Sequence, residues 1–404
     1  MDIDSNTILV TLRDEVELQD AELAAQFYIL EDYYERKLWY QLSEVLKNDI
    51  YKNENSKSIR LRLFDRFILS FSEKINQLQL CEFLVLSLND NSSITPQESL
   101  EYLTNLKERI HKLGEKKSHS SGDEDINDFE IIQSLIYLDN IIAKVKLELG
   151  FIDEVSNIID SNENKIDNLT STVDLRVNSS YYYIKSQLMK YKGDFNSFYH
   201  NCLLFLSYIP NLNELNNKES IVKDIAISGI LGDKIYNFGE IIMHEIFQYL
   251  NNEWLKDLVL SLNSGNLKKF EELINNDKEI KQLPDIINKI DFLKQKVCIM
   301  AFIELVFNKP TNNRCIKYEE ILANIPILNN EDREIEKLVM KSLSLKLIKG
   351  TINQVNKEVE ITWMQPRTMT IEQITSMRDK MEIWKEKVSS LSDYMGNNGS
   401  ELLV

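Results

Sequence analysis

Histidine and cysteine are the side chains best able to hold a metal or act as a nucleophile, and both are rare in this chain. The 404 residues contain four of each. They are His111, His119, His200, His244, Cys81, Cys202, Cys298 and Cys315. A zinc hydrolase needs histidines at a close, fixed spacing, such as His-Glu-x-x-His on one helix. His244-Glu245 begins that pattern, but residue 248 is glutamine, and no two cysteines form a Cys-x-x-Cys pair. We therefore predict no metal site and interpret the cysteines as reduced thiols of an intracellular protein.

Motifs for other common chemistries are also absent from the sequence. It has no Gly-x-Ser-x-Gly for a nucleophilic serine and no Gly-x-x-x-x-Gly-Lys-Ser/Thr for a nucleotide phosphate. Asp and Glu number 64, but they are scattered, and nothing in the sequence brings two of them together for acid–base catalysis. The prediction is a protein that is not an enzyme, with no catalytic residue and no cofactor.

The composition indicates a large, acidic, helical protein. Gly (11) and Pro (6) are scarce, which favours helices because β-rich folds need frequent Gly and Pro turns. A chain of this length is too long for one ordinary core, so two or three packed units are expected. The formal charge of −17 repels both a phosphate backbone and an anionic membrane surface.

Neither a secretion signal nor a membrane span is expected. The first residues are acidic and lack the apolar core of a signal peptide. The longest apolar stretch, 297–307, is interrupted by Glu304 and is shorter than the ~20 residues that cross a bilayer.

A recurring turn signature predicts a series of helix pairs. Gly193-Asp194, Gly232-Asp233 and Gly265-Asn266 share one form, and Gly150 begins a looser copy. Glycine tolerates the left-handed conformation that ends one helix, and Asp or Asn then caps the next. The glycines are 43, 39 and 33 residues apart, which is close to the period of TPR-like repeats. The alternative is a helical bundle without a true repeat.

The pattern after residue 290 predicts a winged helix, with helices at 292–307, 318–324 and 331–347 followed by a hairpin of strands 347–352 and 358–363. In the second strand, Val359, Ile361 and Trp363 alternate and should face the helices. Glu358, Glu360 and Thr362 should then face outward, on a small sheet whose exposed edge pairs with the sheet of a neighbouring protein. The alternative is an edge that stays solvated because of its charges.

Many winged helices read DNA, and the charge of this one argues against that role. Residues 331–364 contain six basic and six acidic side chains. A neutral recognition helix and wing would release few counterions from DNA, so we predict a protein contact and no nucleic-acid binding.

The last predicted helix, 370–395, carries a continuous apolar seam. Its members are Ile374, Met377, Met381, Trp384, Val388, Leu391 and Met395. They are alternately three and four residues apart, which is the a/d pattern of a helix bundle. An isolated helix of this length is marginal in water, so the seam must be buried. We predict that it binds partner helices; the alternative is that it packs back on its own winged helix.

Helical repeats that run into a winged helix resemble the PCI domain of the proteasome lid, the signalosome and a translation initiation factor. Several segments are similar to PCI subunits of the lid of the 26S proteasome regulatory particle in particular. They are 34–39 (YERKLW), 61–65 (LRLFD), 74–78 (KINQL), 194–199 (DFNSFY), 232–240 (GDKIYNFGE), 354–357 (QVNK) and 363–367 (WMQPR).

This resemblance implies a non-catalytic scaffold that supports assembly of the particle and ATP- and ubiquitin-dependent protein degradation. Members of the family sit side by side through their winged helices, and their C-terminal helices gather in a bundle. The implied partners are other lid subunits, both the adjacent PCI subunits and the MPN-domain pair, in a hetero-oligomer located in cytoplasm and nucleus. The alternatives are a PCI subunit of the signalosome or an initiation complex, or a winged-helix nucleic-acid binder.

The predicted fold is mainly α: a TPR-like helical-repeat solenoid, a winged-helix (PCI) subdomain and a C-terminal helix. The expected parts are N-terminal repeats at 1–175, PCI helical repeats at 176–290, the winged helix at 291–366 and the C-terminal helix and tail at 367–404. Residues 114–128 are rich in Ser, Gly and acidic side chains, so we predict a mobile loop there.

Overall fold

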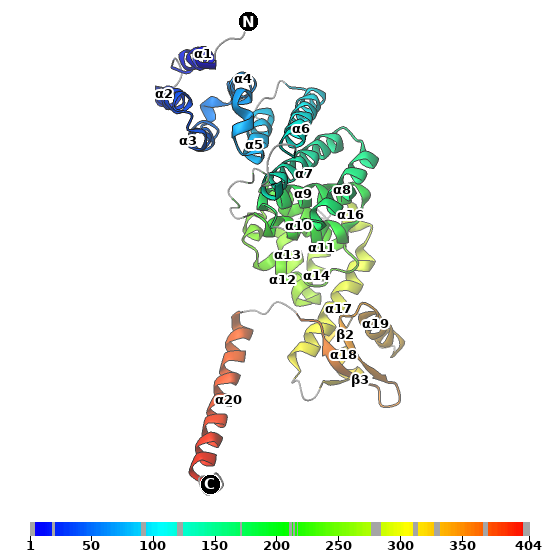
Figure 1. Ribbon diagram of the computed structural model, residues 1–404. Helices are drawn as coiled ribbons and strands as arrows, with labels where there is room; N and C mark the ends of the chain where they lie inside the picture. The colour runs from blue at the N-terminus through cyan, green and yellow to red at the C-terminus, as the bar shows by residue number, and fades with distance from the viewer. Residues whose placement is uncertain are drawn as a thin grey trace. The chain divides into compact units, whose positions relative to one another are not determined.

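The computed structural model describes residues 5–398 apart from 18–20, 90–93, 119–123, 170–171, 210–211, 213–214, 216, 276–283, 310–313, 327–331 and 367–370. It divides into two compact units, Met1–Asn211 and Leu212–Val404. Helices dominate both units, and the described strands all lie late in the second (Figure 1). The predicted mainly α fold with a winged helix is confirmed. The predicted part boundaries remain predictions, and the observed division falls inside the part predicted at 176–290.

The first unit is built from helices that pack mainly against their neighbours in sequence. They are α1 (Ser5–Glu17), α2 (Ala21–Glu35), α3 (Trp39–Val45), α4 (Arg60–Arg66), α5 (Gln77–Asn89), α6 (Pro96–Ser118), α7 (Glu124–Glu148), α8 (Ile152–Asp167), α9 (Leu175–Lys192) and α10 (Phe195–Ser207). Short turns of 3₁₀ or π-helix at Leu46–Ile50, Glu54–Ser56 and Ile68–Lys74 connect α3, α4 and α5.

An aromatic cluster fixes the early helices of this unit. The ring of Trp39 stacks on that of Phe71 at 5.5 Å, and Tyr34 lies 5.2 Å from Phe67. The Lys74 ammonium lies 4.8 Å from the centre of the Trp39 ring. Three of these side chains lie in the segments 34–39 and 74–78 that carried the family resemblance. Those segments therefore contribute to the packing of this unit.

The two described ends of the polar stretch 114–128, residues 114–118 and 124–128, are helical, which corrects the predicted loop there. Helix α6 continues to Ser118 and α7 begins at Glu124, and residues 119–123 lie outside the described part. The composition argument failed because Glu and Lys are good helix formers and extend a helix that needs only a narrow apolar stripe.

The second unit continues the helical series and then changes to the winged helix. Its helices are α11 (Lys218–Leu231), α12 (Gly239–Met243), α13 (Glu253–Ser264), α14 (Leu267–Ile274), α16 (Pro284–Ile287), α17 (Ile290–Asn308), α18 (Tyr318–Asn324), α19 (Asp332–Ser344) and α20 (Ile371–Asn398). The strands are β1 (Cys315–Lys317), β2 (Ile348–Asn353) and β3 (Glu358–Met364). The predicted helices and hairpin of the winged helix and the predicted C-terminal helix are confirmed within a few residues at each end.

The turn signatures have the expected geometry at three of the four glycines. Gly150 (φ 89°), Gly193 (φ 75°) and Gly265 (φ 65°) are left-handed. After the last two, the side chains of Asp194 and Asn266 accept hydrogen bonds from backbone N–H groups two or three residues later and cap α10 and α14. Glycine thus ends one helix and the next residue starts another, as predicted.

The prediction of a left-handed glycine is wrong at Gly232, whose backbone is extended (φ −70°, ψ 131°). A side chain from α17 caps the end of α11 there. The Lys296 ammonium donates hydrogen bonds to the carbonyl oxygens of Gly229, Ile230 and Gly232 at 2.8, 3.1 and 2.7 Å. Lys296, 64 residues further along the chain, thus caps the end of α11 in place of the expected left-handed glycine.

The wing is a three-stranded antiparallel sheet with the order β1-β3-β2, so β3 is central. Residues 315–317 pair with Glu358–Glu360 on one side, and β2 pairs with β3 on the other. Val359 and Ile361 are buried against the helices, as predicted.

Trp363, predicted to face the helices, is instead 40% exposed. The register between β2 and β3 shifts at Lys349/Gly350, so Lys349 lies opposite Trp363 and Gly350 opposite Ile361. The extra residue of this bulge breaks the alternation, and the Trp363 ring instead lies 4.9 Å from the Lys349 ammonium.

Candidate protein-interaction surfaces

The described histidines show no arrangement suited to catalysis or metal binding. His244 Nδ1 accepts a hydrogen bond from the backbone N–H of Ile246 at 3.2 Å and so caps a helical turn. His111 lies on α6 with its Nδ1 3.3 Å from the Glu115 carboxylate. Among the residues that the structure describes, no group of three or more His, Cys, Asp or Glu is placed to hold a metal ion. His119 lies outside the described residues.

The cysteines do not form a reactive site either. Cys81, Cys202 and Cys298 are buried, and Cys315 is exposed on β1. Burial raises the pKa of the Cys298 thiol to about 11 and raises that of Cys81 further. Both therefore stay protonated at neutral pH, whereas a nucleophilic cysteine needs a lowered pKa.

Lys296 is a buried lysine with a strongly lowered pKa, and sequence reasoning missed it. It is fully buried, and its ammonium lies 5.1–5.7 Å from the rings of Tyr236, Phe238 and Phe292. Burial, which outweighs the attraction of Asp233, lowers the pKa of Lys296 to about 7. Enzymes use lysines with lowered pKa as bases, but this one donates to three backbone carbonyls. We assign it a structural role in the second unit. The only signal in the sequence was a lysine directly before the apolar run 297–303 of a helix.

Helix α20 exposes the whole predicted seam. All seven seam residues lie on the helix surface, from 46% exposed at Val388 to 68% at Trp384. Ile383 and Tyr394 are exposed beside them. The hydrogen bonds of its described side chains stay within the helix, for example from Thr375 Oγ1 to the carbonyl oxygen of Ile371 at 2.8 Å. A contiguous row of exposed apolar side chains of this length is typical of a surface that another protein covers.

The predicted wing edge is not an edge, because β3 lies between β1 and β2. The backbones of Glu358 and Glu360 are already paired with β1 on one side and β2 on the other. Glu360 and Thr362 are exposed and Glu358 is half-buried. The sequence could not reveal this because β1 has only three residues, too few for an alternating pattern. A role of these three side chains in protein contact stays a prediction, now for the outer face of the sheet.

No helix within the described ranges combines the length and the apolar character that a membrane crossing would need.

Comparison with known families divides the chain into two matched regions. Residues 26–259 match the model for PSD13 N-terminal repeats, and residues 267–363 match the model for the PCI domain. The second region contains the winged helix and ends one residue before the end of β3.

Similar proteins match over nearly the full length. The chain is 38% identical to the 26S proteasome regulatory subunit RPN9 of Saccharomyces cerevisiae, over 99% of this chain and 98% of that protein. It is 32% identical to the 26S proteasome non-ATPase regulatory subunit 13 homolog A of Arabidopsis thaliana, over 91% of this chain and 92% of that protein. A translation initiation factor 3 subunit M of Drosophila willistoni is 24% identical over only 39% of this chain and 38% of its own length.

Proposed function

Because the chain belongs to the family of 26S proteasome regulatory subunits that combine PSD13 N-terminal repeats with a PCI domain, we infer that it is a non-catalytic scaffold subunit of the regulatory-particle lid. The carrying observation is 38% identity over 99% of the chain to a 26S proteasome regulatory subunit, together with the matches to PSD13 N-terminal repeats and the PCI domain. In this role it supports assembly of the particle and thereby ubiquitin-dependent protein degradation. An initiation-factor subunit is the weaker alternative, since that similarity covers 39% of the chain.

We propose that the chain is regulatory only and catalyses no reaction itself. His244 caps a helical turn, three of the cysteines are buried, and Lys296 donates hydrogen bonds to backbone carbonyl groups. These surroundings favour a protein whose contribution is binding.

We propose that the seam of α20 packs against helices of other lid subunits. Its seven apolar side chains are exposed, and burying each would stabilise a complex by roughly 1.5–3 kcal/mol before the cost of association. The a/d spacing favours neighbouring helices over a flat surface. The partners we propose are the adjacent PCI subunits and the MPN-domain pair, in a hetero-oligomer located in cytoplasm and nucleus.

We also propose that the outer face of the wing contacts a neighbouring PCI subunit. Glu358 and Glu360 would mainly determine which neighbour binds and in which orientation. Charges at the rim of an interface affect specificity and association rate more than affinity. Backbone pairing with a neighbouring sheet would have to use β1 or β2, the outer strands.

Deletion of residues 370–404 tests the proposed function. The tagged full-length chain should co-purify with the other lid subunits, as identified by mass spectrometry. The truncated chain should stay folded, with unchanged melting of its helices, but enter the lid poorly. Co-purification of full-length chain with signalosome or initiation-factor subunits alone would contradict the assignment. Loss of cooperative melting on truncation would show that α20 closes the chain's own core.

A further inference from the structure

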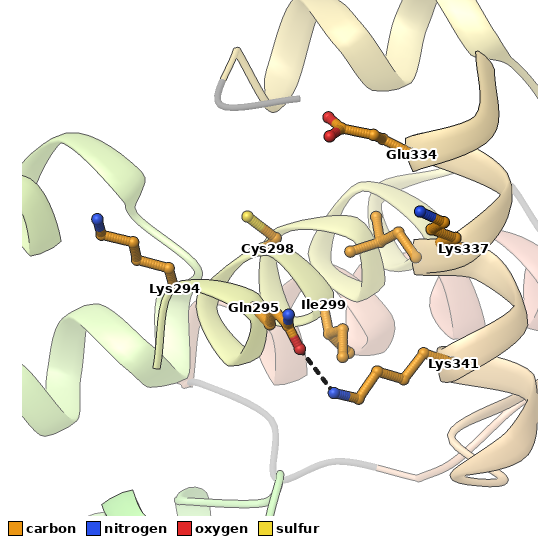
Figure 2. Close-up of a pocket in the computed structure, with 8 residues that line it drawn as sticks. Lys294, Gln295, Cys298, Ile299, Glu334, Lys337 and Lys341 are labelled. Carbon is orange, nitrogen blue, oxygen red and sulfur yellow. Dashed lines mark hydrogen bonds between the residues drawn. The ribbon is translucent and has the colours of Figure 1, made fainter. Parts of the chain in front are cut away.

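A groove of about 470 Å³ lies between α17 and α19 in the winged helix (Figure 2). Its floor is formed by the buried side chains of Cys298, Ile299 and Leu338. Lys294 from α17 and Lys337 from α19 stand on either side of Cys298. The groove therefore offers an apolar floor between two cationic walls.

The charge of this groove is opposite to that of the whole chain. It is lined by three lysines and one carboxylate, Glu334, on a chain of net charge −17. Lys341 is held by Gln295, whose side-chain oxygen accepts its hydrogen bond at 2.8 Å. Within the described part of the chain, Lys294 and Lys337 make no hydrogen bond or ion pair. Two lysines that line the groove thus have no hydrogen-bond or ion-pair partner among the described residues.

We propose that this groove binds an acidic amphipathic segment of a partner lid subunit. One apolar side chain of the segment would cover Cys298 and Leu338, and carboxylates on either side of it would pair with Lys294 and Lys337. A purely apolar segment would desolvate two ammonium groups without compensation, and a basic one would be repelled. A nucleic acid would leave the apolar floor uncovered and meet an acidic protein beyond the groove. The proposal rests on the lid assignment for the complex in which the partner occurs, and it concerns a surface separate from the α20 seam.

Carbodiimide cross-linking of the assembled complex tests this chemistry directly, because the reagent joins an amine to a carboxylate only where the two touch. The complex would be purified through a tag on the full-length chain. We expect cross-links from Lys294 or Lys337 to an Asp or Glu of another subunit that lies within one helical turn of a large apolar residue. The K294R/K337R variant should assemble normally but lose the cross-links, since arginine keeps the charge without the reactive amine.

Charge reversal supplies the second measurement. The K294E/K337E variant should enter the lid at about a tenth of the wild-type level, because two attractions become repulsions. The matched variant K223E/K268E changes the net charge equally at two exposed lysines outside the groove and should enter normally.

Three results would overturn the proposal. The first is normal assembly of K294E/K337E, together with Lys294 and Lys337 of the wild-type chain reacting with an acetylating reagent as fast in the complex as in the free chain. The second is cross-links only to carboxylates of this same polypeptide, which would show that no other subunit supplies the carboxylates in the groove. The third is a full-length chain that never co-purifies with lid subunits, which would overturn the lid assignment and the groove proposal together.

Discussion

Replacing Lys296 with methionine tests whether a buried lysine cap joins α11 to α17. Methionine fills a similar apolar volume but cannot donate the hydrogen bonds to the carbonyl oxygens of Gly229, Ile230 and Gly232. Each buried acceptor left unpaired costs about 1 kcal/mol or more. At pH 8.5 the lysine is mostly neutral and its amine can satisfy two of the three carbonyls. The variant should therefore be less stable there by about 2–3 kcal/mol.

The pH dependence distinguishes this explanation from a simple packing defect. Burial lowers the pKa of Lys296 from 10.5 to about 7, so above pH 7 the unfolded chain binds more protons than the folded chain. Wild-type stability therefore gains from this group as pH rises from about 7 toward 10.5, and it loses that gain as pH falls to 7. The methionine variant lacks this contribution. The stability gap between the two proteins should thus shrink by roughly 1–2 kcal/mol from pH 8.5 to pH 7.

Peptide-resolved hydrogen exchange of the full-length chain measures the effect where it arises. Peptides from α11 and α17 should exchange about 30- to 150-fold faster in the variant at pH 8.5, after correction for intrinsic rates. Peptides from α6 and α7 in the other unit serve as an internal control. Lys294→Met, an exposed change on the same helix, should leave exchange unchanged. A gap that stays constant or widens toward pH 7 would refute the reasoning, because the carbonyls and rings would then be stabilising the ammonium more than burial penalises it.

Three further changes test other parts of the structure. Gly265→Ala should destabilise the protein by about 2–4 kcal/mol in urea unfolding, because its Cβ would lie 2.6 Å from Ala301 backbone atoms on a left-handed residue. Gly193→Ala, left-handed but with open space around its Cβ, should cost only about 1–2 kcal/mol, and equal costs at the two sites would show that the close approach to α17 is unimportant. Trp384→Asp should sharply reduce incorporation into the lid on native gels, since it places a charge in the centre of the exposed seam. The melting of the free chain should stay unchanged. Normal incorporation would show that the seam is not part of the interface. The E358K/E360K double variant should fold normally and dock less well to its neighbour, and unimpaired assembly would argue against a contact through the outer face of the wing.

The elements of the winged helix could be predicted from the sequence because each depends on local patterns. Helical spacing and the acidic first turn locate α19, and the alternation of Val359 and Ile361 locates β3. The seam of α20 could be predicted from the spacing of apolar residues along one helix alone. Left-handed glycines at Gly193 and Gly265 were predictable because glycine and the following cap residue act within a few positions. Each of these features depends on residues that lie close together in the chain.

Contacts between residues far apart in sequence were decided only by the tertiary structure. The three residues of β1 are too few to carry a pattern, and their pairing makes β3 a central strand instead of an edge. The bulge beside Gly350 turns Trp363 outward, because register depends on the partner strand. Lys296 replaces a left-handed glycine at Gly232 from more than 60 residues away along the chain. The groove exists only because α17 and α19 pack together and bring Lys294 near Lys337. A sequence pattern records which residues share one face of an element, whereas these features depend on which faces of two elements meet.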